Sequence, residues 1–271
     1  MWDSRTLVSR PRPVKVKEVL TEKGSVKSIF FQDQMCLNAS PGNFVMVWLP
    51  SIEEIPMNLS RMGDVCSITV WPYSPGTTAL CSMKDGDTIW LRGPYGNPYS
   101  IIGKDILLVG SGSGLSPLFA LAKRIKAKKL SATFVLHAKS KDGLIFYEEL
   151  SKMCKVVAVT GDGSEAVQGK ASEVAANLIK EGRFDSVHAG VGEIELRSIF
   201  DVAESKRIPV QFGLERSMLC GIGLCGSCSI DKYLVCKDGP ILKTEQLRDC
   251  LAELGICRRN KSGAIVPVID Y

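Results

Sequence analysis

The sequence predicts a multidomain α+β protein with three parts. These are an N-terminal antiparallel β-barrel at residues 1–100, a central doubly wound parallel α/β domain at 101–211, and a small C-terminal domain at 212–271. Short strands separated by turns fill the first part, which is typical of a small barrel. Strands then alternate with helices, which predicts a parallel sheet. Four closely spaced cysteines define the last part. At roughly 100–200 residues per domain, a chain of 271 residues accommodates two or three domains.

Composition excludes several classes of protein. The net charge of +5 is modest, and the basic residues are dispersed, so we expect no nucleic-acid partner. The chain has ten cysteines, but its first residues lack the apolar segment of a signal peptide. No apolar run reaches the roughly 18–20 residues of a membrane-spanning helix. We therefore expect a cytoplasmic protein that has no membrane partner.

The barrel is predicted from strands at residues 14–19, 26–31, 44–49, 67–71 and 87–91. The strand at 44–49 is apolar on both faces. A short helix is expected at 77–83. Gly76 and Thr77 stand at its start, where unpaired backbone N–H groups can bind a phosphate.

Four segments of this region resemble the FAD-binding barrel of the ferredoxin–NADP reductase superfamily: residues 41–45, 56–60, 76–77 and 93–97. The resemblance implies bound FAD. Its arginine and flavin-facing serine are replaced here by Ile55 and Asn58, although Asn58 can still donate and accept hydrogen bonds. Arg61 and Arg92 are candidates to supply the missing charge. The alternative is an edge-strand turn at Pro56 and Asn58. The implied FAD contacts are Pro56, Met57, Asn58, Leu59, Thr69, Val70, Gly76 and Thr77.

The central domain begins with an apolar strand at 106–109, a glycine turn and a helix. Gly110, Gly112 and Gly114 would let the backbone approach a nucleotide pyrophosphate at the helix N-terminus. The pattern is G-x-G-x-G-x-x-P, which departs from the strict dinucleotide fingerprint. The domain resembles the nicotinamide-binding domain of the same superfamily, with Asp162 in a turn after a later strand. NAD(P) is therefore a possible further cofactor, although the superfamily's Cys-Gly-Pro is replaced by residues 190–192.

Neither histidine is predicted to be catalytic, because His137 and His188 lie within apolar strands. The sequence also shows no Ser-His-Asp set or recognisable pair of catalytic carboxylates. We therefore predict no catalytic side chain, as suits a protein whose cofactors carry the chemistry.

The strongest motif is Cys220, Cys225, Cys228 and Cys236, with the spacing C-x4-C-x2-C-x7-C. The first three cysteines have the plant-type ferredoxin spacing, and interleaved glycines can turn backbone N–H groups toward sulfur. The motif predicts a [2Fe–2S] cluster, and the alternative is a four-cysteine zinc site. Cys250 and Cys257 form a second pair, which we interpret as packing cysteines over a second metal site.

The segments 215–228 and 236–240 resemble the cluster domain of the electron-transfer subunit of type B dihydroorotate dehydrogenase. The order of FAD barrel, nucleotide domain and [2Fe–2S] domain extends this resemblance over nearly the whole chain. It implies a relay between a catalytic FMN-containing subunit and NAD or another acceptor, in pyrimidine biosynthesis, within a heterotetramer. The alternative is a diaphorase-type subunit of a hydrogenase or an NADH–ferredoxin oxidoreductase. A remote alternative is a zinc-stabilised binding protein without redox function.

Overall fold

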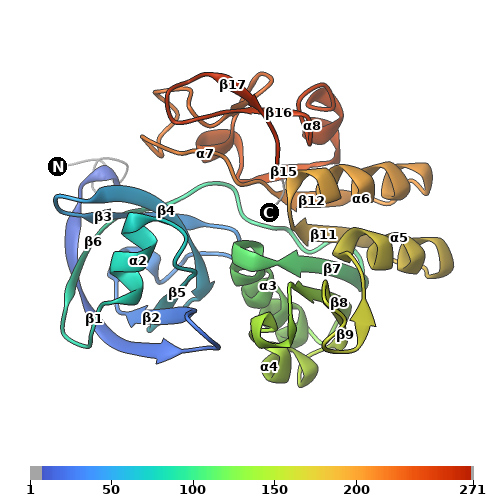
Figure 1. Ribbon diagram of the computed structural model, residues 1–271, viewed down its shortest axis with the longest axis horizontal. Coiled ribbons are helices and arrows are strands. Elements are labelled where there is room, and N and C mark those ends of the chain that lie inside the picture. The colour runs from blue at the N-terminus through green and yellow to red at the C-terminus, as the bar shows by residue number, and fades with distance from the viewer. Residues whose placement is uncertain (1–7, 270–271) are drawn as a thin grey trace.

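The computed structural model describes residues 8–269. A closed barrel lies beside a parallel sheet covered by helices, and the cysteine-containing C-terminal segment lies across the end of both (Figure 1). Among the described residues, none of the helices is both long enough and apolar enough to cross a membrane.

The barrel is antiparallel and has six strands, which confirms the predicted architecture. In their order around the barrel they are β1 (Arg12–Thr21), β2 (Lys27–Phe31), β5 (Cys66–Val70), β4 (Glu53–Arg61), β3 (Phe44–Leu49) and β6 (Thr88–Tyr95), which pairs again with β1. A 3-10 turn (Gln34–Cys36) and helix α2 (Pro75–Cys81) join the strands. Strand β4 extends beyond residues 56–60, the segment that resembles the FAD-binding barrel.

Strand β3 is apolar on both faces because each face packs into a different core. Val45, Val47 and Leu49 point into the barrel core. Phe44 and Met46 point out of the barrel into a second core, which they share with the central sheet and the C-terminal segment. Successive side chains of a strand alternate between its faces, so a strand buried on both faces must be apolar throughout.

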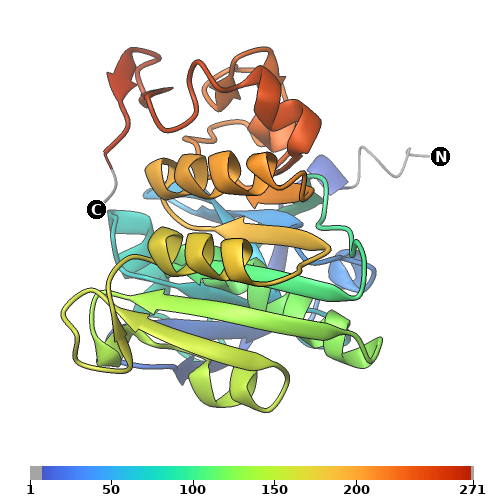
Figure 2. The ribbon, with the colours of Figure 1, turned by 90° about the vertical axis from the view of Figure 1, so that its right-hand side faces the viewer.

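The central sheet has seven strands, of which the first six are parallel. Their order is β10 (Val167–Gln168), β9 (Lys155–Thr160), β8 (Ser131–Ala138), β7 (Asp105–Ser111), β11 (Ser186–Gly190), β12 (Val210–Gly213) and β15 (Ile241–Lys243). Helices α3 (Leu115–Ala127) and α4 (Tyr147–Ser151) cover one face of the sheet. Helices α5 (Ala171–Glu181) and α6 (Glu193–Ser205) cover the other (Figure 2).

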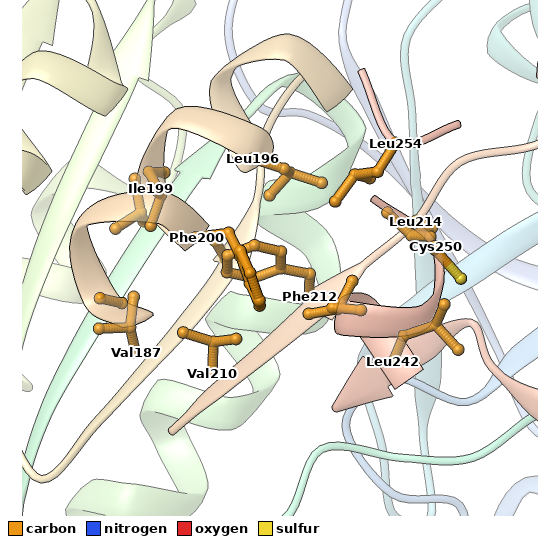
Figure 3. Packing of buried hydrophobic residues seen from close by; sticks show 14 of the residues in the cluster. Val187, Leu196, Ile199, Phe200, Val210, Phe212, Leu214, Leu242, Cys250 and Leu254 are labelled. Carbon is orange, nitrogen blue, oxygen red and sulfur yellow. The ribbon is translucent and has the colours of Figure 1, made fainter. Parts of the chain in front are cut away.

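The C-terminal segment is tied to the central sheet by β15, which runs antiparallel to β12. Figure 3 shows Leu242, Cys250 and Leu254 of this segment packed around Phe200 and Phe212. Its other elements are β13 (Ser229–Ile230), β14 (Tyr233–Leu234), α7 (Val235–Asp238), α8 (Thr244–Asp249), β16 (Cys257–Arg259) and β17 (Ile265–Pro267). The segment that carries the cysteine loop is therefore held in place by strand pairing with the central sheet and by packing into its core.

Arg61 joins the barrel to the central domain. Its guanidinium carbon lies 5.0 Å from the ring centre of Phe119 and 5.4 Å from that of Phe146. It also pairs with Glu22 of the barrel at 3.3 Å and with Glu149 of the central domain at 3.1 Å. Arg61 is thus engaged between the two domains, although the sequence made it a candidate for the missing FAD charge.

We expect Arg61→Met to lower the free energy of unfolding by about 2–4 kcal/mol, because the largely buried Glu22 carboxylate loses its partner. Urea denaturation followed by circular dichroism measures the change. Arg248→Met is the matched control, since Arg248 pairs with Glu204 on the surface and its loss should cost under about 1 kcal/mol. Equal losses in the two variants would contradict the role of Arg61.

Candidate functional site

The cysteine loop is shaped by three glycines in the left-handed region. Gly221, Gly223 and Gly226 have φ of +71°, +79° and +74°. Only glycine adopts these angles at little cost. The resulting turns bring backbone N–H groups to sulfur: Leu224 N donates to Cys220 Sγ at 3.3 Å, and Gly223 N donates to Cys236 Sγ at 3.2 Å.

The four thiols are arranged as two pairs. The Cys225 thiol is within hydrogen-bonding reach of Cys220, and the Cys236 thiol is within reach of Cys228, whose sulfur also accepts from Cys236 N at 3.4 Å. Within residues 8–269, no three His, Cys, Asp or Glu side chains converge on a point that could hold a metal ion. Two thiolates for each of two irons is the arrangement a [2Fe–2S] cluster requires, whereas zinc needs all four at one centre. The residues fit the cluster.

Electrostatics favour the thiolate form of Cys220 and Cys228. Burial opposes ionisation of Cys220, but the N–H groups of Ile222, Leu224 and Cys225 outweigh it and lower the pKa of Cys220 to about 7. The thiol of Cys236 donates to Cys228 and lowers the pKa of Cys228 to about 7 despite burial. The pKa of Cys236 is raised by that same hydrogen bond and by burial. Because thiolates are the metal ligands, the lowered values prepare the loop for iron.

One side of the loop faces solvent. Cys225 is exposed, whereas Cys228 and Cys236 are buried. Leu224 is 79% exposed, Leu219 48% and Ile222 39%. We call Leu219, Ile222 and Leu224 the apolar collar. Three exposed apolar side chains within six residues make this loop a candidate protein contact site.

The two remaining cysteines with a predicted alternative role are packing residues. Cys250 is fully buried in the core of Figure 3, with its sulfur 3.9 Å from the Ile230 carbonyl oxygen. Cys257 lies on β16, paired with Pro267. All ten cysteines lie within the described residues, and none forms a disulfide.

The predicted flavin strand lies next to the cysteine loop. Residues 53–58 of β4 are half-buried on both faces, whereas every residue of β5 is buried, so β4 leaves an uncovered strip that suits a flat ligand. Pro56 pairs across strands with Met46, and Asn58 pairs with Phe44. Met46 in turn touches the loop, since a Cβ at Gly221 would lie 2.8 Å from Met46 Cγ.

An anion already occupies the turn predicted for the FAD pyrophosphate. Gly76 N donates to Glu53 Oε1 at 2.9 Å, and Ser74 Oγ donates to the same oxygen at 3.1 Å. Burial of Glu53 opposes ionisation, but these donors and Lys261 hold the pKa of Glu53 below its usual value. Glu53 shows that this helix end can hold an anion, and binding of the FAD pyrophosphate at Gly76 and Thr77 stays a prediction.

Lys261 lies at this turn, although nothing in the sequence indicates it. Its Nζ lies 3.3 Å from Glu53 Oε2, although the two residues are 208 positions apart. Its side chain places a positive charge beside the turn. Ile55, which replaces the arginine of the superfamily, supplies no charge. No local pattern around Lys261 could have signalled this contact, because it depends on how the C-terminal hairpin β16–β17 folds over the barrel.

Three predicted FAD contacts are buried, two of them inside the barrel and Thr69 on the outer face of β5. Thr69 Oγ1 donates to Ser60 Oγ at 2.8 Å and lies 2.8 Å from Ser28 Oγ. Val70 is fully buried in the barrel core, as is Leu59 of β4. Contact of these residues with FAD remains a prediction, and for Leu59 and Val70 it can involve only the backbone because their side chains point into the barrel core.

The nucleotide candidates gather at the carboxyl ends of the parallel strands. A Cβ on Gly114 would lie 2.2 Å from the Gly190 carbonyl oxygen, so this turn crosses the end of β11 as close as backbone can. Gly112 has φ +50° and open space around it, while Gly110 packs under Leu115. Asp162 accepts from Ser164 N and Oγ in its own turn after β9.

His188 takes no part in this edge. His188 is completely buried, and burial lowers its pKa to about 3, so the ring is neutral. Its Nε2 lies 3.1 Å from Ser186 Oγ, and its ring packs edge-on against Tyr99. His188 is a core residue of the sheet.

Comparison with known proteins decides the family. Residues 215–248 match the model of the iron-sulfur cluster binding domain of dihydroorotate dehydrogenase B. The chain is 38% identical to the probable dihydroorotate dehydrogenase B (NAD(+)), electron transfer subunit of Thermococcus kodakarensis, over 87% of this chain and 97% of the relative. The protein of the same name from Pyrococcus horikoshii is 36% identical over 94% of this chain and 98% of its own. The chain belongs to the family of dihydroorotate dehydrogenase B electron transfer subunits.

Solved structures agree with the fold of this electron transfer subunit. The NADH-dependent reduced ferredoxin–NADP oxidoreductase superposes with a TM-score of 0.78 and 26% identity, covering 89% of this chain and 92% of that one. A ferredoxin NADP+ reductase from Neisseria gonorrhoeae, with a TM-score of 0.60 and 15% identity over 72% of this chain and 91% of its own, shares the fold. The predicted family, fold class and electron-transfer function are confirmed.

We expect Cys225→Ser to abolish the visible absorption and electron paramagnetic resonance (EPR) signal of the cluster while FAD stays bound, because one iron loses a thiolate and flavin contacts lie on the barrel. Cys257→Ser is the matched control and should keep full iron content, since Cys257 lies outside the loop. Full cluster content in Cys225→Ser would disprove the ligand assignment.

Proposed function

We propose that this chain relays electrons between a catalytic, FMN-containing dihydroorotate dehydrogenase subunit and NAD in pyrimidine biosynthesis. The observation that carries the proposal is the partly exposed four-cysteine loop packed directly against β3, beside the predicted flavin strand. When bound, FAD exchanges electron pairs with a nicotinamide and single electrons with the cluster. The protein's own residues hold the two sites adjacent and give the cluster one face toward a partner.

The proposed residues follow from the geometry above, within domains at 1–100, 101–211 and 212–271. Cys220, Cys225, Cys228 and Cys236 bind the cluster. FAD lies along Pro56, Met57 and Asn58 of β4, with Leu59, Thr69 and Val70 behind them and its pyrophosphate at Gly76 and Thr77. The dinucleotide lies at the carboxyl edge of the sheet, near Gly110, Gly112, Gly114 and Asp162.

The proposed partner docks on the apolar collar, and the assembly is a heterotetramer. Hydrophobic side chains around an exposed redox centre suit a protein contact that excludes water. The ten cysteines without a disulfide fit a reducing compartment, so we place the assembly in the cytoplasm without membrane or nucleic-acid partners.

A second candidate is a subunit of an NADH–ferredoxin oxidoreductase. The observation that favours it is the similarity to the reduced ferredoxin–NADP oxidoreductase over 89% of this chain. The two candidates differ in the protein that docks on the collar, so identifying the copurifying partner separates them.

The partner proposal predicts that Leu224→Glu weakens binding to the co-expressed FMN subunit about tenfold or more, because a charge replaces an exposed apolar side chain at the contact centre. Isothermal titration calorimetry measures the affinity. Val167→Glu is the control, since Val167 is exposed on β10 at the opposite edge of the sheet from β15. Wild-type affinity of Leu224→Glu would place the interface elsewhere, and failure of the wild-type chain to bind the FMN subunit would favour the second candidate.

The nucleotide proposal predicts that NADH bleaches the flavin absorbance of the wild-type chain in stopped-flow measurements. Gly114→Ala should slow the bleaching about tenfold, because its Cβ would displace the turn from Gly190. Gly161→Ala is the control, since a Cβ there meets only ordinary contacts at 3.4 Å or more. A flavin that NADH leaves oxidised would contradict direct electron exchange between FAD and a nicotinamide.

A further inference from the structure

Arg92 connects the barrel to the first cluster ligand. It lies on β6, and its Nη2 donates to the backbone carbonyl oxygen of Cys220 at 3.0 Å, across 128 residues of sequence. This is a charge-assisted hydrogen bond, because the guanidinium is always protonated. The side chain is only 12% exposed, so solvent screens the charge little.

Arg92 is itself held in place by the predicted flavin strand. Its Nε and Nη2 donate to the two carboxylate oxygens of Glu54 at 2.7 and 2.6 Å. Glu54 lies on β4 two residues before Pro56, and the Arg92 guanidinium also lies 5.9 Å from the ring centre of Tyr95. A bidentate pair of this kind fixes both the position and the orientation of the guanidinium.

The strand register places this connection where the two redox sites meet. Met46 on β3 pairs with Pro56 on one side and with Arg92 on the other. The same Met46 packs against Gly221, the residue after Cys220. Arg92 therefore contacts the loop at Cys220. It lies beside Met46, which connects β4 to the loop.

We propose that Arg92 is a positioning residue that holds the Cys220 ligand against the flavin side of the barrel and raises the reduction potential of the cluster. The proposal rests on the proposed cluster and FAD sites. Reduction adds negative charge to the cluster, so a fixed positive charge at a ligand favours the reduced form. Glu54 opposes this effect from further along the same pair, so the two side chains should shift the potential in opposite directions.

The test is a dye-mediated redox titration of the holoprotein, monitored by the EPR signal of the reduced cluster. Arg92→Gln removes the positive charge and should lower the equilibrium constant for cluster reduction about tenfold, which is about 59 mV for one electron. Arg92→Lys keeps the positive charge, so the reduction potential of the cluster should stay close to the wild-type value. The line shape of the EPR signal should change. Glu54→Gln leaves the charge of Arg92 unopposed and should raise the potential.

Arg12→Gln is the matched control. Arg12 pairs with Asp33 and donates to the Gly93 carbonyl oxygen at 2.8 Å, so its hydrogen bonds stay within the barrel. Its loss should leave the potential of the cluster unchanged, and an equal shift in Arg12→Gln would reduce Arg92 to a general structural role.

The remaining outcomes each decide the matter. Wild-type potentials in both Arg92→Gln and Glu54→Gln would overturn the proposal. If Arg92→Gln fails to assemble a cluster, Glu54→Gln decides by the sign of its shift, and a lowered potential there would contradict the proposal. A wild-type protein reconstituted with iron and sulfide that shows no cluster signal would instead contradict the proposed cluster site.

Discussion

Phe44 and Met46 leave the barrel and enter a core that also contains the buried cluster cysteines Cys228 and Cys236. The rest of the molecule depends on this contact. The cysteine loop packs against the outward face of strand β3. Burial of such large apolar side chains contributes roughly 1.5–3 kcal/mol each, so the contact is stabilising as well as geometric.

The loop is anchored a second time through the central sheet. Strand β15 follows Cys236, the last of the four cluster cysteines, and pairs with β12, so the segment that binds the cluster also closes the edge of the nucleotide domain. A protein that transfers electrons between two sites needs a fixed separation between them, and packed cores supply it because they are close to incompressible. Here Phe44 and Met46 of the barrel meet the sheet and the loop in one core, which leaves little freedom for the loop to move independently.

Charge has been redistributed around the flavin strand relative to the superfamily pattern. Ile55 stands where the superfamily has an arginine, and the cations arrive from elsewhere in the chain. Lys261 approaches the phosphate-type turn from the C-terminal hairpin. Arg61 is committed to the domain interface, and Arg92 to the cysteine loop. The two arginines thus connect the barrel to its two neighbours.

The sequence by itself determined the features that are written locally. Short apolar segments predicted five of the six barrel strands, the alternation of strands and helices predicted the parallel sheet, and the spacing of four cysteines predicted the cluster loop. The family was predicted by the resemblance of segments 215–228 and 236–240. These succeed because a strand, a turn and a chelating loop are each specified by residues a few positions apart. The glycines of the loop belong to the same class, since positive φ is a local demand.

Only the tertiary structure decided which distant residues meet. It pairs the thiols in twos, and it brings Lys261 to Glu53, Arg92 to Cys220 and β15 to the sheet edge. It also buries Thr69 against Ser28 and Ser60 on the outer face of the barrel, where its sequence position suggested a ligand contact. Contacts across more than a hundred residues leave no periodic or motif signal, because their partners are selected by how whole faces pack and not by local sequence.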